Sequence, residues 1–593
     1  MTSITKVCIC FLLVAIMPLI CLCVIHLNQT LVGHSTGVRY YYTAHTNMHT
    51  TRIHNHHNVE VQHRAPNGGL AQFRTDVRLN NNLEYTQTIH LNGMGQLDRI
   101  NHSRFNVQYT YDPLHQLAAR ITSSNGAHFA HFFMYENGRL TQDEFWAGNV
   151  ANRRRYTYHP NGNVHTVSIN GVLVQEFWYD EHNRLTHYIN HQTGFFRTKM
   201  FDNGGNPILI GDMYVCFDSG MMIPGNTFVL QYDSQWRDLL TSINGQPITH
   251  DQIGNPLQYR DGMEMTWKNG RQLHTVTTSD WGTITMEYDY QGRRTRKTRS
   301  DGTNHFYFWD GNRLIAEQHG SRRLWFFYDD QGVSGLSMSN QDFFFRRNIF
   351  GDVVAIYCQN GILQGRYEYC PWGNTTIIPY ANNLNVMNWN PFRWRGKFQD
   401  QETGFFYLNS RFYDPQTGRF INADDPRMLF LTAPMGQSGS NLFAYALNNP
   451  IMFRDDTGYF PAAILAAIVL TVFVIVPVVS AVAYGYYRLL EWAWNEWLDD
   501  WLPTGVEIRH GASGIPTKPW QNALLRGIIY GVSYIVDAIR FVQERIFGEN
   551  ETYNARIFGM NNHREFNPMC WRLSINSNNN SLNNAERVFA MLF

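Results

Sequence analysis

Histidines gather near the start of the chain and are the first side chains whose type suggests chemistry. A neutral imidazole is a common metal ligand, and this group could in principle bind a metal ion. However, the spacing is irregular, and no cysteine or carboxylate trio accompanies it. We therefore favour a solvated linker or strand here, and we predict neither a metal site nor a cofactor. The histidines are His45, His49, His54, His56, His57 and His63.

Cysteines and further histidines are scattered and do not form a recognisable site. Cys8, Cys10, Cys21 and Cys23 lie inside one apolar stretch, and no CxxC pair with zinc spacing occurs anywhere in the sequence. A disulfide scaffold is therefore not expected. His510, His563 and Cys570 contain the residue types of a Cys/His active site, but nothing in their spacing supports one.

A short aromatic-Asp phrase recurs between about residues 85 and 370 and indicates the elements that would carry any site. Copies include "YTYDPLHQL", "FWYDEHNRL", "MEYDYQGRR" and "FYFWDGNRL". They return with a period of roughly 20 residues, which is typical of a repeat architecture. Alternating aromatic residues place their rings on one face of a strand. The acidic residue can bond its own turn, and glycines such as Gly138, Gly162, Gly292 and Gly311 supply positive φ.

Each copy therefore predicts a β-hairpin whose apolar face is too small to be buried alone. Stacked hairpins would form one long, curling sheet, so we expect a mainly β protein. The repeated tyrosines and aspartates are interpreted as ring packing and turn closure. A carbohydrate-binding surface is the alternative, because exposed aromatic rings could also serve that role.

Composition limits the classes of function. The chain has 593 residues, no formal net charge, 16% charged residues and 15% aromatic residues. An average soluble domain has roughly 25% charged residues. No basic patch marks a nucleic-acid surface, so we expect no nucleic-acid partner.

Two apolar segments flank the repeats. Val7–Ile25 is long enough to cross a bilayer and predicts a signal peptide or, as we favour, an apolar helical membrane anchor. Pro461–Tyr487 carries no charge and predicts a hydrophobic helix, inserted in a membrane or buried in a core. The tryptophan-rich Leu489–Leu502 and the periodic Gln521–Gly548 extend a helical tail that looks membrane-associated. A membrane or extracellular location follows, with the repeats on the exported side.

The last copy of the phrase is longer and carries a family resemblance. It reads "RGKFQDQETGFFYLNSRFYDPQTGRFINADDP" over Arg395–Pro426, followed by "NLFAYALNNP" (Asn441–Pro450) and "DDTGY" (Asp455–Tyr459). These motifs resemble the repeat-associated core of the RHS or YD-repeat family, which includes Rhs proteins, the C subunits of Tc toxins and the shell of teneurins. The resemblance covers roughly residues 85–459.

The resemblance implies a fold and a possible reaction. In the family the sheet spirals into a shell, the core closes one end, and the variable segment that follows is often a toxin held inside. Many bacterial members cut themselves after the core with two aspartates, which correspond here to Asp425 and Asp455. The scissile bond would be Tyr459–Phe460. Two adjacent carboxylates can share a proton, so that one acts as base and the other as acid.

The motif departs from the family pattern at three positions. Asp456 replaces a proline, Tyr459 replaces Leu or Met, and Asp424 stands where a basic residue can occur. Extra negative charge beside each candidate aspartate could disturb proton sharing. The alternative is that both aspartates are structural turn residues.

The predicted domains are a signal peptide or anchor (1–30), a His/Asn-rich lead-in (31–84), the repeat shell (85–390), the core (391–459) and a variable C-terminal region (460–593). We expect a membrane-associated or exported shell that acts as an interaction or encapsulation scaffold, as in teneurins. Its partner would be a protein, a carbohydrate or its own C-terminal region as cargo. The alternative is a toxin-delivery protein that cleaves itself after Tyr459 and releases a membrane-active tail. A turnover enzyme is not expected; intramolecular aspartyl autoproteolysis is the one activity considered.

Overall fold

The computed structural model describes residues 38–43, 48–53, 59–64, 72–124, 126–216, 219–380, 384–426, 429 and 439–459. The chain divides into two compact units. Unit 1 comprises Met1–Asp202, Pro207–Ala423 and Tyr445–Gly458, and unit 2 comprises Asn203–Asn206, Asp424–Ala444 and Tyr459–Phe593. All the strands named below belong to unit 1.

Within the described residues, each strand pairs antiparallel with the next along the chain, in sheets of 19, 14 and four strands. The first sheet consists of β1 (Val38–Thr43), β2 (Met48–Ile53), β3 (Val59–Arg64), β4 (Gln72–Leu79), β5 (Asn82–Leu91), β6 (Leu97–His102), β7 (Phe105–Tyr111), β8 (Leu117–Ser124), β9 (His128–Glu136), β10 (Arg139–Ala147), β11 (Val150–Tyr158), β12 (Val164–Ile169), β13 (Val172–Tyr179), β14 (Leu185–Asn190), β15 (Phe195–Phe201), β16 (Pro207–Val215), β17 (Met222–Tyr232), β18 (Leu240–Ile243) and β19 (Gln246–Pro247).

The second sheet consists of β20 (Thr249–His250), β21 (Pro256–Tyr259), β22 (Met263–Lys268), β23 (Gln272–Thr278), β24 (Gly282–Tyr288), β25 (Arg294–Thr298), β26 (Asn304–Asp310), β27 (Arg313–His319), β28 (Arg322–Asp329), β29 (Gly332–Met338), β30 (Gln341–Arg347), β31 (Val353–Cys358), β32 (Leu363–Tyr369) and β33 (Thr375–Pro379). The third consists of β34 (Phe398–Gln399), β35 (Phe406–Tyr407), β36 (Phe412–Asp414) and β37 (Arg419–Phe420). The helices are α2 (Leu384–Trp389) and the 3-10 turns η3 (Arg260–Gly262), η4 (Trp394–Gly396) and η8 (Ala446–Asn448).

The repeated phrase forms hairpins, and the turn after β24 shows why. Asp289 accepts hydrogen bonds on Oδ1 from the backbone N–H groups of Gln291 (3.0 Å) and Arg293 (2.9 Å). Gly292 has φ +80°, a conformation that glycine adopts without steric cost. The turns at Asp112 and Asp180 are bonded in the same way. The predicted turn closure is therefore confirmed at these copies.

The tyrosine of the phrase connects one hairpin to the hairpin before it. In most copies its hydroxyl donates a hydrogen bond to a backbone carbonyl 14–18 residues upstream. The bond gives this carbonyl a hydrogen-bond partner. The bonds are Tyr111 to Leu97 (2.8 Å), Tyr158 to Leu140 (2.5 Å), Tyr288 to Leu273 (2.8 Å), Tyr328 to Leu314 (2.8 Å) and Tyr369 to Val353 (2.6 Å).

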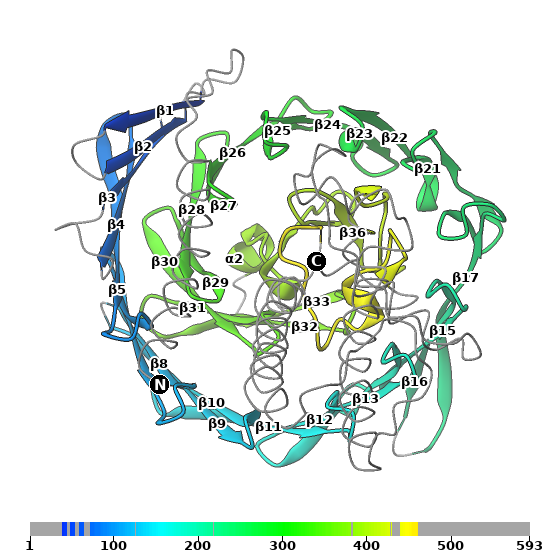
Figure 1. Cartoon of the computed structure of the whole chain (residues 1–593), viewed down its shortest axis with the longest axis horizontal. Helices are drawn as coiled ribbons and strands as arrows, with labels where there is room; N and C mark the ends of the chain where they lie inside the picture. Colours follow the sequence, from blue (N-terminus) through cyan, green and yellow to red (C-terminus); the bar gives the residue numbers. More distant parts are fainter. Residues whose placement is uncertain are drawn as a thin grey trace, which may run out of the picture. The chain divides into compact units, whose positions relative to one another are not determined.

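Two apolar clusters unite distant parts of unit 1. One joins strands β3–β10 to strands β26–β31 and includes the ring contact between Phe105 and Phe344. The other joins the second sheet to the segment around β34–β37, with Phe326 packed edge-on against Phe392. In Figure 1 the strands of this unit follow one another along a curved path, with α2 and β36 on its concave side. The core-region motif is thus packed against the inner face of the repeat sheets.

Candidate functional site

Asp455, the first candidate aspartate, is 1% exposed and lies in a tight turn of unit 1. Its Oδ1 accepts hydrogen bonds from the backbone N–H groups of Thr457 (3.0 Å) and Gly458 (2.8 Å). Its Oδ2 lies 3.7 Å from Nη2 of Arg411. These contacts hold the carboxylate of Asp455 in a fixed position within its turn.

Asp425, the second candidate, belongs to unit 2 and is half-buried. Its backbone N–H donates to Oδ1 of Asp424 (2.7 Å), and the N–H of Asp424 donates to the carbonyl of Leu442 (3.0 Å). Asn441 in the same unit donates to Oδ1 of Asn206 (2.6 Å). Asp425 and Asp455 therefore lie in different units, each with its own hydrogen bonds, and their joint use in cleavage stays a prediction.

Asp456, which replaces the proline of the family motif, has its negative charge paired with nearby cations. Its carboxylate accepts hydrogen bonds from Nζ of Lys397 (2.9 Å) and from Nη2 of Arg454 (2.9 Å). Burial by itself would raise the pKa of Asp456, but the two cations outweigh it and lower the pKa below its usual range. The additional negative charge beside Asp455 is thus paired with two positive charges.

The chain leaves the core through a closely held turn. Nε of Arg411 donates to the carbonyl of Gly458, and Oγ of Ser410 donates to the carbonyl of Thr457 (2.8 Å). Tyr459, the next residue, is 49% exposed, and Phe460 lies outside the described residues. The carbonyl that Arg411 binds is one residue before the bond predicted to be cut, so this contact positions the chain without polarising that bond.

A buried ion pair joins the family motif to the repeats at Asp414, the aspartate of "FYDP". Nε and Nη2 of Arg260 donate to its two oxygens at 2.9 and 3.1 Å, and the hydroxyl of Tyr259 donates at 3.1 Å. Asp414 is fully buried, and Arg260 is 9% exposed. Two parallel bonds to a carboxylate combine charge with a fixed geometry.

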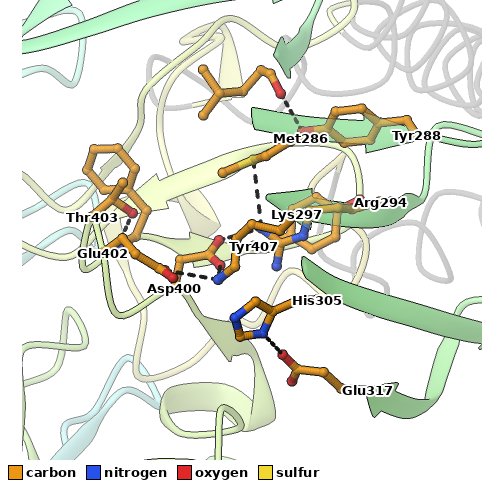
Figure 2. A network of polar contacts seen from close by, with 12 residues as sticks. Met286, Tyr288, Arg294, Lys297, His305, Glu317, Asp400, Glu402, Thr403 and Tyr407 are labelled. Carbon is orange, nitrogen blue, oxygen red and sulfur yellow. Dashed lines mark hydrogen bonds and ion pairs between the residues drawn. The ribbon is translucent and has the colours of Figure 1, made fainter. Parts of the chain in front are cut away.

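A second ionic network holds the "DQET" segment against β25, as Figure 2 shows. Asp400 accepts hydrogen bonds from Nη1 of Arg294 (2.6 Å) and from Nζ of Lys297 (2.9 Å). Glu402 accepts from Nζ of the same lysine (2.9 Å) and from Nε of Arg299 (2.6 Å). Burial alone would raise the pKa of Glu402, but Lys297 and Arg299 lower it to about 2.

A third set of contacts surrounds Cys370, which stands in "RYEYCPWGN" at the place where other copies of the phrase have aspartate. Nη1 of Arg197 donates to Sγ of Cys370 (3.3 Å) and to Oδ1 of Asn374 (2.7 Å), while its other nitrogens bind Asp212. Lys199 is 2% exposed, and its Nζ donates to the carbonyl of Thr417 (2.9 Å). Burial lowers the pKa of Lys199 well below its ordinary value.

Sequence reasoning missed these cations. The missed cations lie in the repeats, where each could equally be a solvated strand residue. They are Arg197, Lys199, Arg260, Arg294 and Lys297. The available signal was the set of five acidic residues in the core motif, because carboxylates that become buried require positive partners.

Several other candidates fall outside the described residues. These are His45, His54, His56, His57, His510, His563, Cys570, the apolar segments Val7–Ile25 and Pro461–Tyr487, and the segments Leu489–Leu502 and Gln521–Gly548. His49 lies on β2 and His63 on β3. Among the described residues, no group of three or more potential ligands could hold a metal ion, and no helix is both long and apolar enough to cross a membrane.

Comparison with known proteins identifies the family. The family model described as Teneurin YD-shell matches residues 96–451. The tRNA3(Ser)-specific nuclease WapA of Bacillus spizizenii is 32% identical over 232 residues, which are 37% of this chain and 9% of that protein. Teneurin-3 of Danio rerio is 26% identical over 334 residues, which are 54% of this chain and 11% of that protein.

The fold also has a solved counterpart. The crystal structure of TcdB2-TccC3 without its hypervariable C-terminal region superposes with a TM-score of 0.50 and 17% identity, covering 71% of this chain and 24% of that one. The chain thus spans less than a tenth of the first curated relative and about a quarter of the solved structure. The repeat strands, the core motif and the matched family model together show that this chain belongs to the teneurin YD-shell family of RHS/YD-repeat proteins.

Proposed function

We propose that the chain is an exported or membrane-associated YD-repeat scaffold that holds its own C-terminal region, residues 460–593, at a fixed point of the shell. The observation that carries this proposal is the anchored exit of the core. Arg411 and Ser410 bind the carbonyls of Gly458 and Thr457. Buried ion pairs at Asp400 and Asp414 bind the same core to the repeat sheets.

This arrangement suits a shell that presents its C-terminal region at one position better than a shell that carries this region on a flexible linker. The carbonyls of Thr457 and Gly458 are both hydrogen-bonded to the core, so the point on the shell from which the next residues start is fixed. The family name and the likeness to teneurin-3 support an exported or membrane location. The apolar segments Val7–Ile25 and Pro461–Tyr487 add the sequence argument for a membrane partner.

Membrane association is tested by alkaline carbonate extraction of cells that express the full chain, followed by protease treatment of sealed vesicles. We expect the chain to stay in the membrane pellet and the shell to be cut from one side only. A matched chain in which Leu470, Val472 and Ile475 are changed to Asp tests the second apolar segment. Complete release of the unaltered chain by carbonate would contradict the membrane part of the proposal.

A second function, toxin delivery with self-cleavage, is favoured by one specific observation. Asp455 is a buried, backbone-bonded carboxylate four residues before the predicted scissile bond. The likeness to a relative named as a tRNA nuclease supports release of residues 460–593. In this mechanism Asp455 would activate water as base, and Asp425 would give a proton to the leaving nitrogen, with Tyr459–Phe460 as the bond that breaks.

Intact mass of the purified chain distinguishes the two functions. If the chain is a self-cleaving delivery protein, the wild type is cut into two fragments between Tyr459 and Phe460. The variants Asp425→Asn and Asp455→Asn then stay whole. Asp456→Asn is the matched control and should still be cut, because its carboxylate serves Lys397 and Arg454. A single uncut wild-type chain would remove the delivery function and leave the scaffold proposal intact.

The proposed cargo is tested separately. Residues 460–593 expressed alone should make cells permeable to a small dye if they are membrane-active. Harmless expression at the same level would contradict a pore-forming tail.

A further inference from the structure

A small cavity lies inside unit 1 where the first sheet packs on the second. Its volume is about 30 Å³, and strands β7–β10 supply one wall while β28–β31 supply the other. Aromatic rings such as Phe105, Phe129 and Phe344 make up much of the lining. Among these rings, however, lie three arginines: Arg120, Arg346 and Arg347.

Arg346 is the exceptional member of this lining. It is 7% exposed, and its guanidinium lies 4.8 Å from the ring centroid of Phe145. Its Nε and Nη2 have no hydrogen-bond partner within the described part of the chain. The same holds, among the described residues, for Nε of Arg347 and Oγ of Ser334, which line the same cavity. Buried polar groups of native proteins almost always have a partner.

The carboxylates nearby already have partners. Asp329 binds Nη1 of Arg120 (3.4 Å) and Nη2 of Arg347. The more exposed Asp330 lies 3.7 Å from Arg120 and accepts a hydrogen bond from Tyr109. Arg120 and Arg347 therefore have carboxylate partners, whereas no carboxylate among the described residues forms an ion pair with Arg346, and Asp143 attracts it only at longer range.

The carboxylate of Asp143, on β10 beside β9, also has hydrogen-bond partners. Asp143 accepts hydrogen bonds from Nε2 of His131 (2.7 Å) and from the hydroxyl of Tyr156. Burial lowers the pKa of His131 to about 4, so the imidazole is neutral near pH 7 and its Nδ1 accepts from Arg120. Burial, with Arg154 nearby, also lowers the pKa of Arg346 to about 10, which still leaves this guanidinium charged near pH 7.

We propose that this cavity binds one small monovalent anion, with Nε and Nη2 of Arg346, Nε of Arg347 and Oγ of Ser334 as its donors. An uncompensated buried charge is costly, and an anion removes that cost. One water needs roughly 10–15 Å³, so the cavity has room for a halide but not for a phosphate or sulfate group. Chloride, the common small anion of extracellular fluids, is the expected ligand.

Bound chloride would contact donors of β29 and β30, at the place where the second sheet packs on β8 and β9 of the first. These sheets meet here through residues more than 200 positions apart, as in the contact of Arg120 with Asp329. A ligand that binds the folded state alone stabilises it in proportion to the logarithm of its concentration. The stability of the shell should therefore depend on halide and not only on ionic strength.

Thermal unfolding of the full chain tests this dependence. Sodium chloride and sodium gluconate are compared at equal ionic strength, with chloride raised stepwise. We expect the midpoint temperature to rise with the logarithm of chloride in wild type and to be constant in Arg346→Gln. Arg366→Gln, an equal charge change at an exposed position of β32, should keep the rise. Equal midpoints in the two salts for wild type would overturn the proposal.

Crystallography with bromide gives a second test that needs no variant, should Arg346→Gln fail to fold. Crystals of the full chain grown in sodium bromide should show an anomalous peak in the cavity beside Arg346. Density that fits water, with no anomalous signal above the level of surface sites, would overturn the proposal.

Discussion

Aspartate has two different roles in the repeats and in the core, although both regions spell the same aromatic-Asp phrase. In the repeats, Asp112 and Asp180 accept hydrogen bonds from backbone N–H groups two and four residues later. In the core, Asp414 also accepts from Gln416 two residues on (3.0 Å), but its main partner is Arg260, 154 residues earlier in the chain.

This difference explains how the two regions vary. Asp112 and Asp180 are satisfied by their own turns, so such a copy can drift or be replaced, as Cys370 replaces the aspartate before β33, while the backbone bonds of the turn persist. Asp329 differs, since it also binds the distant Arg120. Asp414 in the core is buried with a distant cation, and its removal takes away the bidentate partner of the buried Arg260. The repeats are therefore tolerant units, whereas the core depends on the complete shell.

The largest expected effect comes from breaking one core pair. Asp414→Ala removes the bidentate partner of the buried Arg260 and leaves it only Asp261, and we expect a loss of about 3 kcal/mol in unfolding free energy. The matched repeat variant, Asp112→Ala, removes only turn bonds and should cost about 0.5–1.5 kcal/mol. Urea unfolding of both variants measures the difference. Equal losses would remove the distinction between core and repeat aspartates.

Acid should weaken the core through Glu402. The folded-state pKa of Glu402 is about 2, against an ordinary value of 4.5. Its contribution is therefore complete above pH 4.5 and is lost as the pH falls from 4.5 toward 2. At about 1.4 kcal/mol per pKa unit, this contribution is roughly 3 kcal/mol.

Stability measured from pH 6 to pH 2 checks this contribution. Glu402→Gln should flatten the decline between pH 4.5 and 2. Glu287→Gln, at a side chain that is 47% exposed, should leave it unchanged. A decline of the same steepness in Glu402→Gln would show that other carboxylates carry the acid sensitivity.

The exit of the core can be disturbed by one methyl group. Gly458 has φ +77°, and an added Cβ would lie 2.6 Å from Oγ of Ser410 and 2.7 Å from the carbonyl oxygen of Leu408. Gly458→Ala should cost about 2–3 kcal/mol through left-handed strain and crowding. Gly404→Ala is the control, because Gly404 has φ +74° with open space around it. This variant should lose only about 1 kcal/mol of unfolding free energy. Limited proteolysis after residue 455 should accelerate in Gly458→Ala alone.

The smallest effect tests the tyrosine link between repeats. Tyr288→Phe leaves the carbonyl of Leu273 without its donor, and we expect a cost of about 1–2 kcal/mol. Tyr214→Phe, at a side chain that is 47% exposed, should cost less than about 0.5 kcal/mol. Thermal unfolding under one set of conditions compares the two. A negligible change in Tyr288→Phe would show that ring packing alone explains the repeated tyrosine.

The sequence predicted the local elements well, because their causes are local. Alternating aromatic residues, a turn aspartate and a glycine at positive φ lie within ten residues, so the hairpin at Asp289 and Gly292 could be inferred directly. The candidate site was less accessible. Asp455 was found through the family motif, but the guanidinium of Arg411 beside it comes from another segment, and the pairing of Asp456 with Lys397 was not foreseen. The cleavage role of Asp425 and Asp455 stays a prediction.

By itself the sequence determined the repeat, its turns and the family to which the core motif belongs, since each depends on residue types at short spacing. Tertiary structure alone decided which cation meets which carboxylate, where each tyrosine hydroxyl bonds and which arginine is left uncompensated. The physical reason is that a backbone turn is a short-range interaction. A buried charge, by contrast, is stabilised by whatever partner the packed sheets bring to it, and spacing along the chain does not encode that partner.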